Sequence, residues 1–205
     1  MLPLFLPTTA RLLDQAASEQ PAFIRDAAQA KAIEYLDKLW TELMMFKRKR
    51  NRFLGRSLRS PQLPKGLYFY GGVGRGKSFL MDVFYGCLPY KRKRRVHFHA
   101  FMAEVHKRMK ALRGEPDPLK AVAAEIAKET RVLCFDEFHV SDIADAMILG
   151  RLLENLFEDG VVLVATSNYA PAELYPQGQN RSSFLSTIAL LEQKLTVLNV
   201  DGGED

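Results

Sequence analysis

The sequence has 205 residues, enough for one α/β domain with a full hydrophobic core, alone or with an extension. Its apolar share of 47% and charged share of 26% exclude wholesale disorder. No apolar run approaches the roughly 20 residues of a membrane-spanning helix. The 29 Lys and Arg residues exceed the 24 Asp and Glu residues only modestly, and they gather in the runs Lys47–Arg50 and Lys91–Arg95.

These basic runs have two interpretations. They could attract the phosphates of nucleic acid or of an anionic membrane surface. They could equally be solvated loops and helix ends, because no aromatic residues alternate with the charges. The two cysteines, Cys87 and Cys134, lack C-x-x-C spacing, and Cys134 lies in an apolar run that predicts burial. With no signal peptide at residues 1–7, we expect a soluble protein of the reducing cytoplasm.

The first expected element is a helix over 22–46, where apolar residues recur at steps of three and four. A basic connector with Pro61 and Pro64 follows over 47–65. Strand patterns then cover 66–70, 95–99, 131–136, 161–166 and 195–200, and helical patterns cover 77–85, 100–113, 119–129, 142–157 and 181–194. This alternation predicts a five-stranded parallel sheet with helices on both faces. We therefore expect an N-terminal helical extension and connector over 1–64 and a core over 65–205.

The stretch from residue 71 to residue 78 fits the pattern G-x-x-x-x-G-K-[ST], and we call it the phosphate loop. It reads Gly71, Gly72, Val73, Gly74, Arg75, Gly76, Lys77 and Ser78. Its glycines allow tight turns that point successive N–H groups at a phosphate, and the helix that follows turns its positive end toward the same anion. Lys77 would contact the β- and γ-phosphates, and Ser78 would offer its hydroxyl to Mg²⁺. The loop therefore predicts ATP binding.

Two carboxylates end the apolar strand that begins at Arg131. Asp136 would hold Mg²⁺, and Glu137 would orient and polarise the attacking water. The strand over 161–166 leads into Ser167 and Asn168, and we expect Asn168 to position the water and sense the γ-phosphate. The alternative is that Ser167 and Asn168 only begin a turn before Pro171.

Arg181 stands before the last strand, and Arg suits recognition of phosphate oxygens. It could act as an arginine finger on a neighbouring subunit, or it could be a surface residue at a helix start. Among the histidines, His97 and His99 fall two apart on an expected strand, and His106 lies on the next helix. A metal site among them is conceivable, although no acidic or cysteine ligand lies nearby in the sequence.

The motifs in this order resemble the AAA+ branch of P-loop ATPases. Five short segments resemble the ZapE and Afg-like family more specifically: 65–70, 95–102, 134–140, and the pairs Leu174-Tyr175 and Asn180-Arg181. The resemblance implies an oligomeric ATPase at the inner face of the division site that acts on the FtsZ ring. It also implies that Asp136 and Glu137 form the Walker B pair, that Asn168 is sensor one and that Arg181 is the finger. Family members continue into a lid region that this sequence lacks, so we expect a truncated core.

Three other functions compete with an ATP-hydrolysing machine. A P-loop phosphotransferase acting on a small metabolite is disfavoured by the Asp136–Glu137 pair and by Asn168. A scaffold could bind ATP only to set its shape. A helicase-loader-like ATPase on DNA is suggested by the basic runs, and salt-sensitive binding of single-stranded DNA would support it.

Overall fold

The computed structural model describes residues 27–51 and 62–201, and the expected helix start at 22–26 lies outside them. Five parallel strands form one sheet in the order β2-β3-β4-β1-β5. They are β1 (Gly66–Tyr70), β2 (Lys93–His97), β3 (Val132–Asp136), β4 (Val162–Ser167) and β5 (Leu195–Asn199). β3 and β4 are buried along their whole length, which explains their unbroken apolar sequences. The predicted α/β fold with a five-stranded parallel sheet is confirmed.

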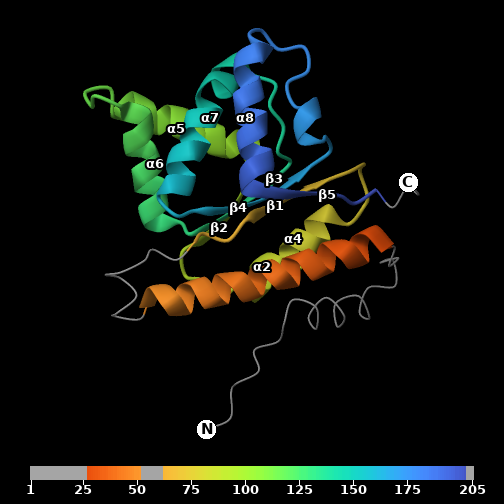
Figure 1. Ribbon diagram of the computed structural model, residues 1–205. Coiled ribbons are helices and arrows are strands. Elements are labelled where there is room, and N and C mark those ends of the chain that lie inside the picture. Colours follow the sequence, from red (N-terminus) through yellow and green to blue (C-terminus); the bar gives the residue numbers. More distant parts are fainter. Residues whose placement is uncertain (1–26, 52–61, 202–205) are drawn as a thin grey trace.

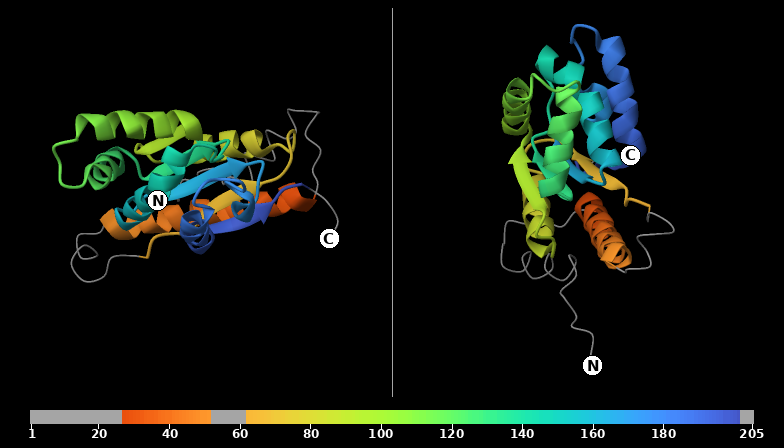
Figure 2. Two further views of the ribbon diagram at one scale, coloured as in Figure 1. Left: turned by 90° about the horizontal axis from the view of Figure 1, so that it is seen from above. Right: turned by 90° about the vertical axis from the view of Figure 1, so that its left-hand side faces the viewer.

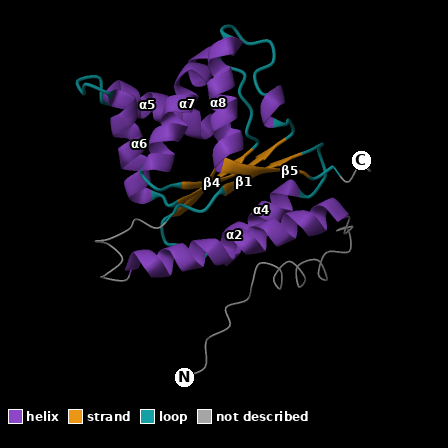
Figure 3. Cartoon of the chain, in the orientation of Figure 1, coloured by secondary structure: helices purple, strands orange, loops and turns teal. Residues whose placement is uncertain are grey.

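Helices cover both faces of this sheet and make three layers (Figures 1 and 2). On one face lie α2 (Ala27–Asn51) and α4 (Lys77–Cys87), the lower helices in Figure 3. The other face carries α5 (Phe98–Ala111), α6 (Pro118–Glu129), α7 (Ile143–Glu158) and α8 (Arg181–Lys194). A short 3₁₀ helix, η1 (Pro171–Glu173), links β4 to α8 and was not predicted from the sequence.

Successive residues of β3 point into different layers of the core. Leu133 and Phe135 join the cluster under α5–α8, whereas Val132 and Cys134 join the cluster under α2 and α4. In the first cluster, the rings of Phe98 and Phe138 have centroids 4.5 Å apart. Cys134 is fully buried, as predicted, and burial raises the pKa of its thiol to about 12. The thiol is therefore an apolar core group.

Several element boundaries differ by one or more residues from the sequence-based expectation, among them those of the first helix and of the second strand. The first helix does not end at Phe46 but continues through Asn51, so the beginning of the expected basic connector is helical. The second strand was expected over 95–99 but runs over Lys93–His97. The helical repeat of buried residues already begins at Phe98, and Phe98, Phe101 and Met102 all enter the core from α5. Burial of this helical face moves the strand end back to His97.

Hydrogen bonds fasten α2 to the core along its length. The indole Nε1 of Trp40 donates to the carbonyl of Cys87 over 3.2 Å. The hydroxyl of Tyr90 donates to the carbonyl of Leu43 over 2.7 Å. Near the start of the helix, Nε2 of Gln29 donates over 3.3 Å to a carbonyl in the phosphate loop, that of Arg75. The helix therefore packs as a layer of the core, and the division of the chain at residue 64 stays a prediction.

Candidate active site

The three predicted motifs meet at the carboxyl edge of the sheet. β1 leads into the phosphate loop, β3 ends at Asp136, and β4, which ends at Ser167, lies between these two strands. A cavity of about 380 Å³ opens there, lined by Val73–Ser78, Glu137 and Thr166–Asn168. Polar strand ends in a parallel sheet converge at one edge, where ligands of open α/β sheets bind. This cavity is the candidate active site.

The N-terminus of α4 is left open toward this cavity. Gly76 precedes the helix with a φ of 73°, a left-handed conformation that glycine adopts without steric cost. α4 has no side-chain cap and no acidic residue in its first turn, whereas Asp117 caps α6 and Asp142 caps α7. The first N–H groups of a helix require an acceptor, and an uncapped end supplies them to an anion. The start of α4 therefore fits a phosphate group.

Lys77 is buried in the loop that it would use to hold phosphate. Its Nζ donates to the carbonyl of Gly71 over 2.5 Å and to that of Gly72 over 2.6 Å. Burial lowers the pKa of the ammonium group, and the nearby carboxylate of Asp201 opposes that shift. The cationic group predicted to contact phosphate is thus held at the rim of the cavity by the loop's own backbone.

Asp201 and Gln29, from opposite ends of the described chain, both contact the loop. The carboxylate of Asp201, just after β5, accepts a hydrogen bond from the N–H of Gly72. The same oxygen lies 3.6 Å from Nε of Arg75. Gln29 of α2 donates to the carbonyl of Arg75. Sequence reasoning missed both supports, because neither residue belongs to a recognisable motif and both are distant from the loop in sequence.

Asp136 is paired with an arginine of the neighbouring strand. Nε of Arg95 donates to Oδ2 of Asp136 over 2.7 Å, and a terminal nitrogen donates to Oδ1 over 3.1 Å. The other terminal nitrogen pairs with Asp82 of α4. Burial alone would lower the pKa of Arg95, but the bonds from the two carboxylates outweigh it and raise the pKa. Arg95 thus joins the end of β3 to the helix that follows the phosphate loop.

Glu137 has a strained backbone and an exposed side chain. Its φ of 54° is unusual for a residue other than glycine and costs about 1–2 kcal/mol. Thr166 stabilises this turn, since its carbonyl accepts from the N–H of Phe138 over 2.7 Å. The Glu137 side chain is 74% exposed at the cavity, and its Oε2 lies 3.6 Å from Nδ1 of His97. The fold therefore presents this carboxylate where it can reach a water molecule.

Ser167 and Asn168 have different surroundings. The buried Ser167 hydroxyl donates to the carbonyl of Phe138 over 2.7 Å and accepts from the N–H of Tyr169 over 3.1 Å. It therefore builds the turn that the sequence suggested as an alternative. Asn168 is exposed and lines the cavity together with Glu137. Its role as water-positioning residue stays a prediction.

Arg181 begins α8 and contacts the loop before it. Its guanidinium donates to the carbonyls of Ala172 and Leu174, each over 2.7 Å, and to that of Tyr175 over 3.2 Å. These partners all belong to its own chain, and Arg181 does not line the cavity. The contacts give Arg181 a structural role in ordering η1 and the following turn, and the finger role stays a prediction.

The histidines do not share a strand as expected. β2 ends at His97, so His99 stands on α5, and the two ring centroids are 6.0 Å apart. His106 contacts Asp145 of α7, with 2.7 Å between Nε2 and Oδ1. Within residues 27–51 and 62–201, no group of three or more His, Cys, Asp or Glu residues is arranged to hold a metal ion.

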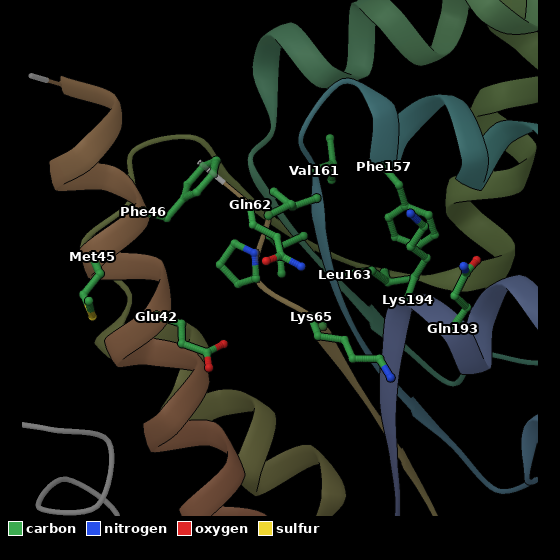
Figure 4. Close-up of a pocket in the computed structure, with 14 residues that line it drawn as sticks. Glu42, Met45, Phe46, Gln62, Lys65, Phe157, Val161, Leu163, Gln193 and Lys194 are labelled. Carbon is green, nitrogen blue, oxygen red and sulfur yellow. The ribbon is translucent and has the colours of Figure 1, made fainter. Parts of the chain in front are cut away.

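A larger cavity, of about 710 Å³, lies at the opposite edge of the sheet, where the strands begin (Figure 4). Its walls come from α2 (Glu42 and Met45), the segment before β1 (Gln62 and Lys65) and the end of α8 (Lys194). None of the catalytic, phosphate-binding or metal-binding residues expected from the sequence lines it. Among the described helices, none combines the length and apolar character that a bilayer span requires.

Comparison with known proteins places these features in a family. The model of the AFG1-like ATPase family matches residues 7–205. The cell division protein ZapE of Escherichia coli (strain K12) is 55% identical over 141 residues, which are 69% of this chain and 38% of that protein. Lactation elevated protein 1 homolog B of Danio rerio is 47% identical over 156 residues, 71% of this chain and 31% of that protein. The chain thus spans less than half the length of these curated relatives.

Solved structures resemble the fold at low sequence identity. The crystal structure of DnaI has a TM-score of 0.56 at 17% identity and covers 95% of this chain and 94% of its own. The DnaC helicase loader has a TM-score of 0.58 at 14% identity, with coverages of 86% and 92%. Identities this low show a shared fold alone, and the family match is what carries the assignment. The chain belongs to the AFG1-like ATPase family.

Proposed function

We propose that this chain binds ATP and hydrolyses it to ADP and phosphate at the cavity bounded by the phosphate loop. The observation that carries the proposal is the convergence of the open start of α4, Glu137 and Asn168 on one cavity. The N–H groups of the loop and Lys77 hold the phosphates. Glu137 orients the attacking water and receives its proton, and Asn168 positions that water beside the γ-phosphate.

Ser78 and Asp136 are the residues that would hold Mg²⁺. A serine hydroxyl in the first turn of α4 and a carboxylate at the end of β3 are oxygen donors, the ligand type that Mg²⁺ prefers. The ion would neutralise charge on the β- and γ-phosphates. The two residues are positioned by neighbouring elements, because α4 packs against β3.

We further propose that the ATPase assembles as a homo-oligomer and acts on the FtsZ ring at the cytoplasmic face of the division site. Membership of the family and the relative named as a cell division protein support this proposal. In such an assembly, Arg181 would act on the γ-phosphate of the adjacent subunit. To do so, its guanidinium would have to exchange bonds to backbone carbonyls of its own chain for bonds to that phosphate.

One observation weakens the alternative of DNA or membrane binding through the basic run Lys91–Arg95. Four of its five side chains have partners inside the chain. Arg92 donates to the carbonyl of Ala127, and Lys93 donates to those of Tyr85 and Leu88. Arg94 forms an ion pair with Glu104, and Arg95 forms one with Asp136. In the other run, Nζ of Lys47 donates to the carbonyl of Pro89 over 2.6 Å. Much of the basic charge therefore stabilises the fold.

The test is the rate of phosphate release per chain, measured against protein concentration with and without purified FtsZ polymer. The proposal expects a rate that rises with concentration as subunits assemble, and that rises further with FtsZ. Phosphorylated metabolite in place of free phosphate would favour a phosphotransferase. Salt-sensitive binding of single-stranded DNA, with stimulation by DNA and none by FtsZ, would favour a loader-like ATPase. Absence of ATP binding would overturn the proposal.

A further inference from the structure

Arg95 makes three directed contacts around the predicted Mg²⁺ site. Its guanidinium contacts both carboxylate oxygens of Asp136 and one oxygen of Asp82. The side chains of Arg95 and Asp136 are only 21% and 12% exposed, respectively. In the sheet, Arg95 pairs with Cys134, two residues before the pair formed by His97 and Asp136. The arginine therefore lies beside Asp136 as a consequence of strand pairing.

We propose that Arg95 positions Mg²⁺ by holding Asp136 in a fixed orientation. This inference depends on the proposed ATP site. A carboxylate held at both oxygens by a planar guanidinium has a fixed orientation, yet each oxygen keeps a further lone pair. Asp136 can therefore still accept a metal ion or a metal-bound water while Arg95 prevents its rotation. Groups that orient metal ligands typically change metal affinity about 10–100-fold when they are removed.

The contact with Asp82 gives this arrangement a second function. Asp82 lies on α4, the helix that begins at Lys77 and Ser78. Arg95 therefore ties the β3 carboxylate to the helix that carries the serine hydroxyl, and it fixes the two Mg²⁺ ligands relative to one another. Lysine could replace the charge but not this planar geometry, because an ammonium group is a single donor centre.

The experiment compares the affinity of the full 205-residue chain for a non-hydrolysable ATP analogue, by calorimetry, in Mg²⁺ and in EDTA. In the parent, Mg²⁺ should tighten binding. In Arg95→Gln, binding in EDTA should stay within about threefold of the parent, while the gain from Mg²⁺ should fall about 10–100-fold. Arg94→Gln is the matched control, because Arg94 is the preceding residue and is also ion-paired, to Glu104 on α5.

Each outcome decides the proposal. The proposal is overturned if Mg²⁺ raises the nucleotide affinity of Arg95→Gln as much as, or more than, that of the parent. It is also overturned if Arg94→Gln loses as much of this Mg²⁺-dependent affinity as Arg95→Gln does. If Arg95→Gln does not fold, Arg95→Lys is measured instead. A smaller increase in nucleotide affinity on adding Mg²⁺ than in the parent supports the role of the planar contact, and an increase equal to the parent's overturns the proposal. A parent that binds nucleotide without any Mg²⁺ gain also overturns this inference alone. A parent that binds no nucleotide overturns the proposed function, and this inference with it.

Discussion

The ammonium group of Lys77 donates to the backbone carbonyl of Gly71 over 2.5 Å, so the lysine closes the loop that it is proposed to use on phosphate. This contact fixes the position of the charge before any ligand arrives. A bound phosphate would therefore meet a preorganised cation, and little side-chain entropy would be lost on binding.

We expect Lys77→Ala to abolish binding of ATP, because it removes the point charge directed at the β- and γ-phosphates. Calorimetry with ATP and Mg²⁺ measures this effect. Lys128→Ala is the control, since Lys128 is exposed on α6, far along the chain from the loop. Equal affinities in Lys77→Ala and in the parent would show that nucleotide does not bind at the phosphate loop.

We expect Glu137→Gln to bind ATP normally and to hydrolyse it at least about tenfold more slowly, because losing a general base typically costs about 10²–10⁴-fold. The amide has the same shape but cannot accept the proton of the attacking water. Phosphate release under saturating ATP is the measurement, in a chain long enough to be active, with Glu158→Gln as an exposed control on α7. Unchanged turnover would make Glu137 a structural residue.

Arg181→Ala should leave ATP binding nearly intact and reduce hydrolysis by up to about 10³-fold, if the residue acts as an arginine finger. Mixing this variant with Glu137→Gln should restore part of the activity, because some interfaces then combine an intact Glu137 with an intact Arg181. The measurement is the ATPase rate across mixing ratios. No recovery in mixtures that demonstrably form joint oligomers would contradict a role across subunits.

The structure also predicts a cost in stability for Arg181→Ala. The substitution removes three hydrogen bonds to backbone carbonyls, of which the one to Ala172 is exposed, and a hydrogen bond typically contributes about 0.5–1.5 kcal/mol. Denaturant unfolding of the single variant separates this effect from catalysis. A lower ATPase rate with recovery on mixing, beside a modest loss of stability, would mean that Arg181 has both roles.

Gly66→Ala should destabilise the fold by about 1–3 kcal/mol or more, the typical cost of forcing extra atoms into a packed core. A Cβ at Gly66 would lie 2.0 Å from the carbonyl oxygen of Leu163, and that backbone is held in the sheet by strand pairing. Gly86→Ala is the matched control, because its Cβ would meet nothing within 4 Å. Gly86 lies on α4, where alanine should stabilise by up to about 1 kcal/mol.

Urea unfolding of the two glycine variants and the parent measures these differences. The two changes should move the unfolding midpoint in opposite directions although both add the same methyl group. Equal stability of Gly66→Ala and the parent would mean that β1 and β4 are not packed as closely as described.

The phosphate loop, the Asp136–Glu137 pair and the strand that ends before Asn168 could be predicted from the sequence because each is a local pattern with a physical reason. Glycines at fixed spacing and carboxylates after an apolar run are visible without knowing the fold. The parallel sheet was predictable for the same reason, since strand and helix patterns alternate along the chain.

The contacts of Arg95 and Asp201 could not be predicted, because they depend on strand order. Arg95 meets Asp136 only because β2 lies beside β3, and Asp201 meets Gly72 only because β5 lies beside β1. One signal was present: the basic run adjoins the strand expected from Arg95 onward, and a charged residue on a half-buried strand requires an acidic or carbonyl partner. That signal predicts that these side chains have partners but not which residues the partners are.

The place of β1 between β4 and β5 also determines when the site can form during synthesis. β1 leaves the ribosome early, yet its ladder partners Val164 and Thr196 are made much later. Non-local pairing of this kind is slow, because a long loop must close, at a cost in chain entropy, before any stabilising contact forms. A nascent chain that stops short of β5 would expose one edge of β1 and lack Asp201 under Gly72. Stabilisation of the folded state by nucleotide at the phosphate loop should therefore be greatest once β5 and Asp201 have been added.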